Sequence, residues 1–150
     1  MKVPDIKINT MKQEDKQLLL QDLCARLPYQ PLCKKVDTED DFCNYDAPLG
    51  YSLRDLVNNK IIIKPYLRPM SSMTEEESAE LSNIISEWFD KELFYLTEES
   101  FLRYALSKIN YSISPLLFDF LNKNHFDYRG LIPKGLAIEA PEGMYNIKNK

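Results

Sequence analysis

The residue types that could support acid–base chemistry come closest together near the end of the chain. His125, the only histidine, is followed by Asp127 and Arg129 in the glycine-containing stretch HFDYRGLIPKGLAIEAPEGMY. A histidine beside a carboxylate and an arginine could act as a general base with an oriented partner. The alternative is that His125 ends a helix while Asp127 and Arg129 hold a turn. Because residues one or two positions apart need not converge on one substrate, we favour a structural or interface role.

The sequence lacks the motifs that announce the common catalytic chemistries. It has no GxSxG nucleophile elbow, no GxxxxGK[ST] or GxGxxG phosphate-binding loop and no CxxC pair. A single histidine also leaves little for histidine-dependent hydrolysis. We therefore expect a protein that is not an enzyme and that uses no cofactor.

Two sets of residues invite the idea of a metal site, and neither pattern favours it. Cys24, Cys33 and Cys43 with His125 would complete a Cys3His zinc set, but the cysteines are nine and ten residues apart. We expect free, buried thiols instead. The acids between Asp37 and Asp46 could attract calcium or magnesium, yet no glycine lies among them at the mid-loop position that an EF-hand requires. A solvated loop is the favoured interpretation.

Charge is distributed unevenly along the 150 residues, whose net charge is −4. Residues 75–99 carry nine acids against one lysine, whereas residues 1–36 and 100–150 each carry three more basic than acidic side chains. Nucleic-acid affinity rests on lysines and arginines that neutralise phosphates, so the acidic centre is a poor nucleic-acid surface. It would attract a basic partner surface. The residues expected to bind that partner are Asp37, Glu39, Asp40, Asp41, Glu75, Glu76, Glu77 and Glu80.

The first half of the chain predicts one helix and a small β element. Residues 10–27 have a capping-box pair, Thr10 and Gln13, and an apolar face with helical spacing. Residues 28–66 are the least regular, with short strands expected near 32–36 and 60–64 and a helical turn over 53–57. The face expected to be buried on the first helix consists of Leu20, Leu23, Cys24 and Leu27, with Leu19 beside it.

The second half predicts three more helices. Residues 65–74 read as an extended connector, after which Thr74 and Glu77 form a second capping box for a helix reaching about Asp90. A third helix is expected over 98–110, and a fourth opens at Ser114-Pro115 and ends near 124–125. Residues 131–140 form a short strand or a helical turn, followed by a turn over 141–143. The fold class is α+β, mainly helical, with about four helices and a two- or three-stranded β element near residues 28–66, in a single compact domain over 1–150.

The pattern of apolar residues bears on where the protein works. No apolar run approaches the length of about 18 residues that a membrane span needs, and the N-terminal segment lacks the apolar region of a secretory signal. We expect a cytoplasmic protein.

Three segments carry a resemblance to known sequences: Leu18–Tyr29 (LLLQDLCARLPY), Lys64–Glu77 (KPYLRPMSSMTEEE) and His125–Tyr145. Together they resemble a family of uncharacterised small proteins of prophages and other mobile elements of gut Bacteroidetes. Residues 34–63 are particular to this chain. The resemblance implies an intracellular, phage-borne accessory protein and carries over no catalytic residue.

These observations lead to one favoured function and two alternatives. We expect a non-catalytic accessory protein that binds a host protein through an acidic surface, for example a ribonucleoprotein nuclease of host defence, which would make it an anti-CRISPR-like inhibitor. One alternative is an unfamiliar enzyme centred on His125, Asp127 and Arg129. The other is a nucleic-acid-binding regulator using the basic termini, namely Lys2, Lys7, Lys12, Lys16, Lys148 and Lys150.

Overall fold

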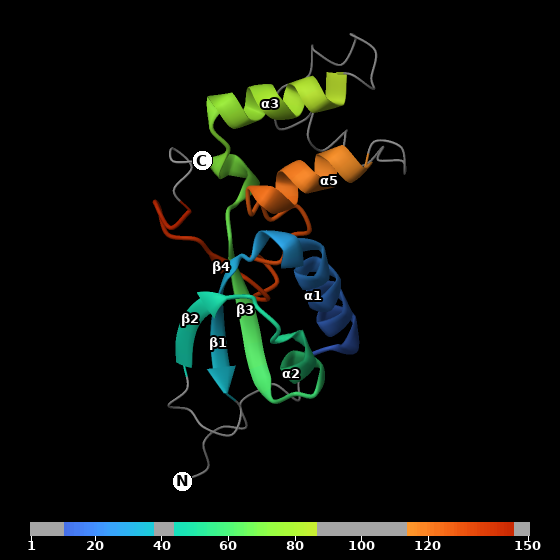
Figure 1. Ribbon diagram of the computed structural model, residues 1–150, viewed down its shortest axis with the longest axis vertical. Helices are drawn as coiled ribbons and strands as arrows, with labels where there is room; N and C mark the ends of the chain where they lie inside the picture. The colour runs from blue at the N-terminus through green and yellow to red at the C-terminus, as the bar shows by residue number, and fades with distance from the viewer. Residues whose placement is uncertain (1–10, 38–43, 87–113, 146–150) are drawn as a thin grey trace.

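The computed structural model describes residues 11–37, 44–86 and 114–145 (Figure 1). Within these ranges the chain forms four α-helices, a four-stranded sheet and two short 3-10 helices. This is the α+β class that the sequence predicts. The elements in chain order are α1 (Gln13–Arg26), η2 (Leu27–Tyr29), β1 (Leu32–Asp37), β2 (Asn44–Pro48), α2 (Leu53–Val57), β3 (Ile61–Leu67), η3 (Met70–Ser72), α3 (Glu75–Ser86), α5 (Ser114–Lys123) and β4 (Ile138–Glu139).

Strand β3 is the element to which most of the structure is attached. The sheet has the order β2-β1-β3-β4, with antiparallel pairs along β2-β1-β3 and a parallel pair between β3 and β4. Beyond its last residue the chain makes one more parallel bridge, in which the Arg68 N–H donates to His125 O (2.7 Å) and Asp127 N–H donates to Arg68 O (2.8 Å). The segment after α5 is therefore fixed to the end of β3.

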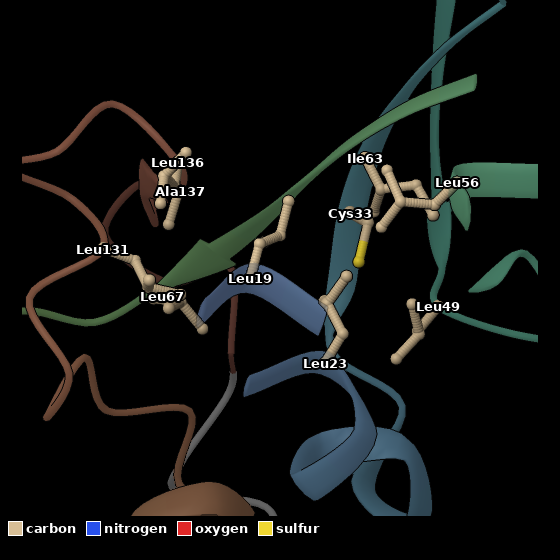
Figure 2. Packing of buried hydrophobic residues seen from close by; sticks show 10 residues of the cluster. All are labelled: Leu19, Leu23, Cys33, Leu49, Leu56, Ile63, Leu67, Leu131, Leu136 and Ala137. Carbon is tan, nitrogen blue, oxygen red and sulfur yellow. The ribbon is translucent and has the colours of Figure 1, made fainter. Parts of the chain in front are cut away.

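One hydrophobic core lies between the sheet and the helices α1 and α2. Leu19 and Leu23 of α1 contact a cluster that includes Cys33 and Ile63 of the strands, all fully buried (Figure 2). Residues 131–137 close its other end with Leu131, Leu136 and Ala137. The Cys33 thiol is inert, because burial raises its pKa to about 12 although Lys35 and Arg26 oppose that shift.

A second core joins α3 to α5. Leu81 and Ile85 of α3 face Leu117 and Leu121 of α5, and Phe126 packs beneath them. The helical stripe predicted for residues 75–90 is thus confirmed for Leu81, Ile84 and Ile85, while Trp88 and Phe89 lie outside the described residues. Figure 1 shows the two helices stacked at one end of the sheet, away from α2.

Most of the predicted elements are confirmed, and the sheet is larger than predicted. Strands near 32–36 and 60–64, the short helix over 53–57 and the helix opening at Ser114 are all present. Strand β2 is not among the predicted elements, because its NYDAP sequence lacks a β-branched residue, and the two-residue β4 falls where the sequence predicts either a strand or a helical turn. The extended connector predicted over 65–74 is correct for only part of that range, because β3 extends to Leu67 and Met70–Ser72 form the 3-10 helix η3. The helix predicted over 98–110 lies outside the described residues.

The first helix begins later than predicted, and the predicted buried face is confirmed in part: Leu23 is fully buried, and Leu20 and Leu27 pack partly buried against the core. Helix α1 starts at Gln13, with Lys12 at its N-cap and no side-chain capping bond, and Thr10 lies outside the described residues. The Cys24 side chain is exposed, which corrects the prediction of a buried thiol, and Cys43 also lies outside the described residues. The residues of α1 that are buried are Leu19, Asp22, Leu23 and Arg26.

Two polar residues can occupy the core side of α1 because they neutralise each other. Arg26 Nε donates to Asp22 Oδ2 at 2.7 Å, and both side chains are fully buried. Arg26 Nη2 also donates to Phe126 O (2.6 Å), and Arg129 Nη1 donates to Asp22 Oδ1 (2.9 Å). One carboxylate thus binds two guanidinium groups and joins α1 to the segment after α5.

Replacing Asp22 should therefore cost far more stability than replacing an exposed acid. Asp22→Asn leaves the Arg26 charge buried without its counter-charge, so we expect the free energy of unfolding to fall by about 3–5 kcal/mol. Glu14→Gln, on the exposed side of the same helix, should change it by less than about 0.5 kcal/mol. Urea denaturation of both variants measures the difference, and equal stabilities would contradict this role for Asp22.

Candidate functional site

A groove of about 1030 Å³ lies where α3, the end of α5 and the C-terminal segment meet. One wall is the start of α3 with Thr74, Glu76 and Glu80, and the end of α5 contributes Lys123 and Asn124. The opposite wall is formed by residues 139–143 and Tyr145. In Figure 1 the red C-terminal segment runs from β4 on the side of β3 opposite α1.

The floor of the groove is a buried ion pair between Arg68 and Glu77. The guanidinium donates two parallel hydrogen bonds, from Nη1 to Oε1 (2.7 Å) and from Nη2 to Oε2 (2.8 Å). It also donates to Ser72 O (3.1 Å) and Asn124 O (3.3 Å) and lies 4.3 Å from the centre of the Phe126 ring. This bidentate geometry fixes both side chains.

The predicted capping box at the start of α3 is confirmed and is part of the same floor. Thr74 N–H donates to Glu77 Oε2 (2.9 Å), and Glu77 N–H donates to Thr74 Oγ1 (3.2 Å). Burial alone would raise the pKa of Glu77. The hydrogen bonds from Arg68 and Thr74 and the Arg68 charge outweigh burial, so the pKa of Glu77 lies below its ordinary value.

The rim of the groove is acidic. Glu76 and Glu80 are four residues apart on α3 and both are exposed, as are Glu139 and Glu142 on the opposite wall. The lining as a whole has five acids against Arg68 and Lys123, a net charge of −3. Exposed carboxylates from two elements far apart in the sequence therefore line the same groove.

The wall opposite α3 is held by one tyrosine. Tyr145 Oη accepts from Leu32 N–H (3.0 Å) at the start of β1 and donates to Tyr66 O (2.7 Å) in β3. Its ring stacks on His125, with centroids 3.9 Å apart and planes at 21°. Burial raises the pKa of Tyr145, so the hydroxyl keeps its proton as a donor at neutral pH.

The side chains of His125, Asp127 and Arg129 have separate partners. His125 adopts a left-handed conformation (φ 62°) just after α5 and stacks on Tyr145. The Asp127 carboxylate accepts from Leu131 N–H (2.7 Å) and Ile132 N–H (2.9 Å), whereas Arg129 binds Asp22. The predicted helix end and turn are present, and these contacts do not place the three groups around a common substrate position.

The acids predicted to bind a partner fall into four groups. Glu75, Glu76 and Glu80 are exposed on α3, although Glu75 does not line the groove. Glu77 must be removed from the set, because its carboxylate is 6% exposed and paired with Arg68. Asp37 ends β1 and is half-buried. The remaining three, Glu39, Asp40 and Asp41, lie outside the described residues.

Two acids of the site, Glu139 and Glu142, escaped the sequence analysis. The sequence does place Glu142 in an exposed turn, which the Met144 N–H to Pro141 O bond (3.1 Å) confirms. Nothing in the local pattern indicates that this turn lies opposite α3. That juxtaposition arises from the parallel pairing of β4 with β3.

Two of the basic residues proposed for nucleic-acid binding lie in the described ranges. Lys12 is exposed, whereas Lys16 Nζ donates to Asn59 Oδ1 (2.8 Å) and Val57 O (3.3 Å). Lys2, Lys7, Lys148 and Lys150 lie outside the described residues.

In the described ranges, no three or more His, Cys, Asp or Glu side chains are grouped so that they could hold a metal ion. No helix there is long and apolar enough to cross a membrane.

Comparison with known protein families, with curated proteins and with solved structures finds no match for this chain.

Loss of the Glu77 charge should destabilise the protein in a pH-dependent way. Glu77→Gln is expected to lower the free energy of unfolding by about 3 kcal/mol at neutral pH, because Arg68 remains buried. Since the pKa of Glu77 is lowered by folding, its contribution is complete above the unfolded value of 4.5 and is lost as the pH falls through the folded pKa.

Urea denaturation of the wild-type protein and of Glu77→Gln between neutral and acid pH tests this expectation. The stability difference should shrink below about pH 4.5. Glu76→Gln, its exposed neighbour, should differ from the wild type by less than about 0.5 kcal/mol at neutral pH. A pH-independent difference for Glu77→Gln would contradict the assigned ion pair.

Proposed function

We propose that this protein is a non-catalytic accessory protein that binds a basic segment of a partner protein in its acidic groove. The observation that carries the proposal is the pair of facing walls, Glu76 and Glu80 on α3 and Glu139 and Glu142 opposite. A lysine or arginine side chain entering between them would lie near carboxylates on both sides. A flat acidic surface would offer carboxylates on one side only.

The electrostatics of the groove favour a cationic occupant. Its lining has a net charge of −3, and the exposed carboxylates on the rim act over roughly the 8–10 Å of the Debye length at moderate salt. Complementary charge of this kind speeds association and selects partners more than it adds affinity. Binding should accordingly weaken as salt is added.

The rigidity of the floor supports binding without chemistry. Glu77, the buried acid of the α3 cluster, is already neutralised by Arg68, which helps to lower its pKa. The rim acids are thus left to interact with a partner, while the floor keeps α3 at a fixed distance from the end of β3.

The resemblance to phage-borne proteins suggests which basic surface this is. A nucleic-acid-binding surface is rich in lysine and arginine, and a host defence nuclease presents one. On this proposal the protein acts in the host cytoplasm and occupies that surface as an inhibitor, in the manner of an anti-CRISPR protein.

Charge reversal inside the groove should abolish partner binding. The double variant Glu76→Lys with Glu80→Lys places two cations against a cationic occupant, and repulsion should reduce binding by at least about tenfold. Affinity purification from the native host with wild-type and variant protein as bait, followed by titration of the captured partner, measures the loss.

The matched control reverses two exposed acids that do not line the groove, Glu14→Lys with Glu75→Lys. It makes the same change in net charge and should bind nearly as the wild type does. Equal loss of binding in both double variants would show that overall charge acts, and unchanged binding in the groove variant would refute the proposal.

A further inference from the structure

The wall of the groove that faces α3 is a strap of chain, residues 140–145, anchored at its two ends. At one end Ala140 N–H donates to Leu67 O (2.8 Å) in continuation of the β3–β4 pairing. At the other end Tyr145 reaches the sheet. Between them Pro141, Glu142 and Gly143 are exposed.

The contacts of Tyr145 reach well beyond its neighbours in the sequence. Its hydroxyl bridges Leu32 and Tyr66, which lie 113 and 79 residues away and belong to two strands of the sheet. Its ring packs on His125, which the left-handed backbone turns back after α5. The strap is therefore attached to β1, β3 and the end of α5 through one side chain.

We infer that Tyr145 is a positioning residue for the acidic groove, which it forms in advance by holding Glu142 opposite α3. The binding consequence rests on the function proposed above. A strap fastened only at Ala140 would sample many conformations, and a partner would have to order it on binding. Glu139 does not depend on Tyr145 in this way, because the pairing of β4 with β3 holds it.

Hydrogen exchange tests the attachment of the strap without any partner. Tyr145→Phe keeps the ring and removes both hydroxyl hydrogen bonds, so the amide of Met144 should exchange about tenfold faster, whereas that of Ala140, which the β3–β4 pairing holds, should keep its protection. The amides of α1 and α5 should keep their protection, which shows that the variant is folded. Tyr51→Phe, at a side chain that is 98% exposed, is the control and should change nothing. Unchanged exchange at Met144 would overturn the inference.

Coupling between substitutions tests the effect on binding, with fluorescein-labelled oligolysine as the probe. In the wild-type background Glu142→Gln and Glu139→Gln should each weaken binding about twofold to fivefold. In the Tyr145→Phe background Glu142→Gln should have little further effect, whereas Glu139→Gln should keep its full effect. If Tyr145 is merely structural, Tyr145→Phe should lower stability and leave the binding losses caused by Glu142→Gln and Glu139→Gln unchanged. That result would overturn the positioning role.

The two proposals fail in different ways. A wild-type protein that binds no oligolysine at low salt refutes the acidic groove as a binding site and the binding role of Tyr145 with it. Hydrogen exchange then still decides whether Tyr145 holds the strap. If oligolysine binds, and Glu142→Gln and Glu139→Gln each weaken binding by the same factor in the wild-type and Tyr145→Phe backgrounds, the proposed function stands and Tyr145 has no part in it.

Discussion

The bidentate ion pair between Arg68 and Glu77 is the interaction on which the arrangement of α3, η3 and the end of α5 around the end of β3 depends. Arg68 extends β3, Glu77 is in the first turns of α3, and the same guanidinium binds carbonyls of Ser72 and Asn124. Because a buried charge cannot be left unpaired without a large cost, these segments must come together in one geometry. The shape of the groove between these segments is therefore fixed as well.

The same constraint separates two roles among neighbouring glutamates. Glu75, Glu76 and Glu77 are consecutive and would all favour the start of a helix. Only Glu77 turns toward the core, where it caps α3 and neutralises Arg68. Its neighbours keep their charges at the surface, and Glu76, together with Glu80 one turn later, gives the groove its acidic rim. A cluster of acids in a sequence can therefore contain both a carboxylate buried in an ion pair and exposed carboxylates that line a groove.

Local patterns in the sequence were enough to predict much of the secondary structure. The capping box of Thr74 and Glu77, the proline that opens α5 and the β-branched run at residues 61–63 each specify an element by nearby contacts alone. The burial of Asp22 and Arg26 could not be predicted, because a polar residue reads as exposed unless its distant partners, Phe126 and Arg129, are known. The acidic wall at Glu139 and Glu142 was missed for the same reason.

The hydrogen bond from Arg26 to Phe126 O joins positions one hundred residues apart, and Arg129 binds Asp22 of the same helix. During synthesis on the ribosome, α1 is finished long before either of these groups exists. Until residues 126–129 have emerged, Asp22 and Arg26 of the first helix lack the distant partners that bind them in the folded protein. These contacts therefore cannot form until residues 126–129 have been made, and contacts of such long range form more slowly than the local ones within α1.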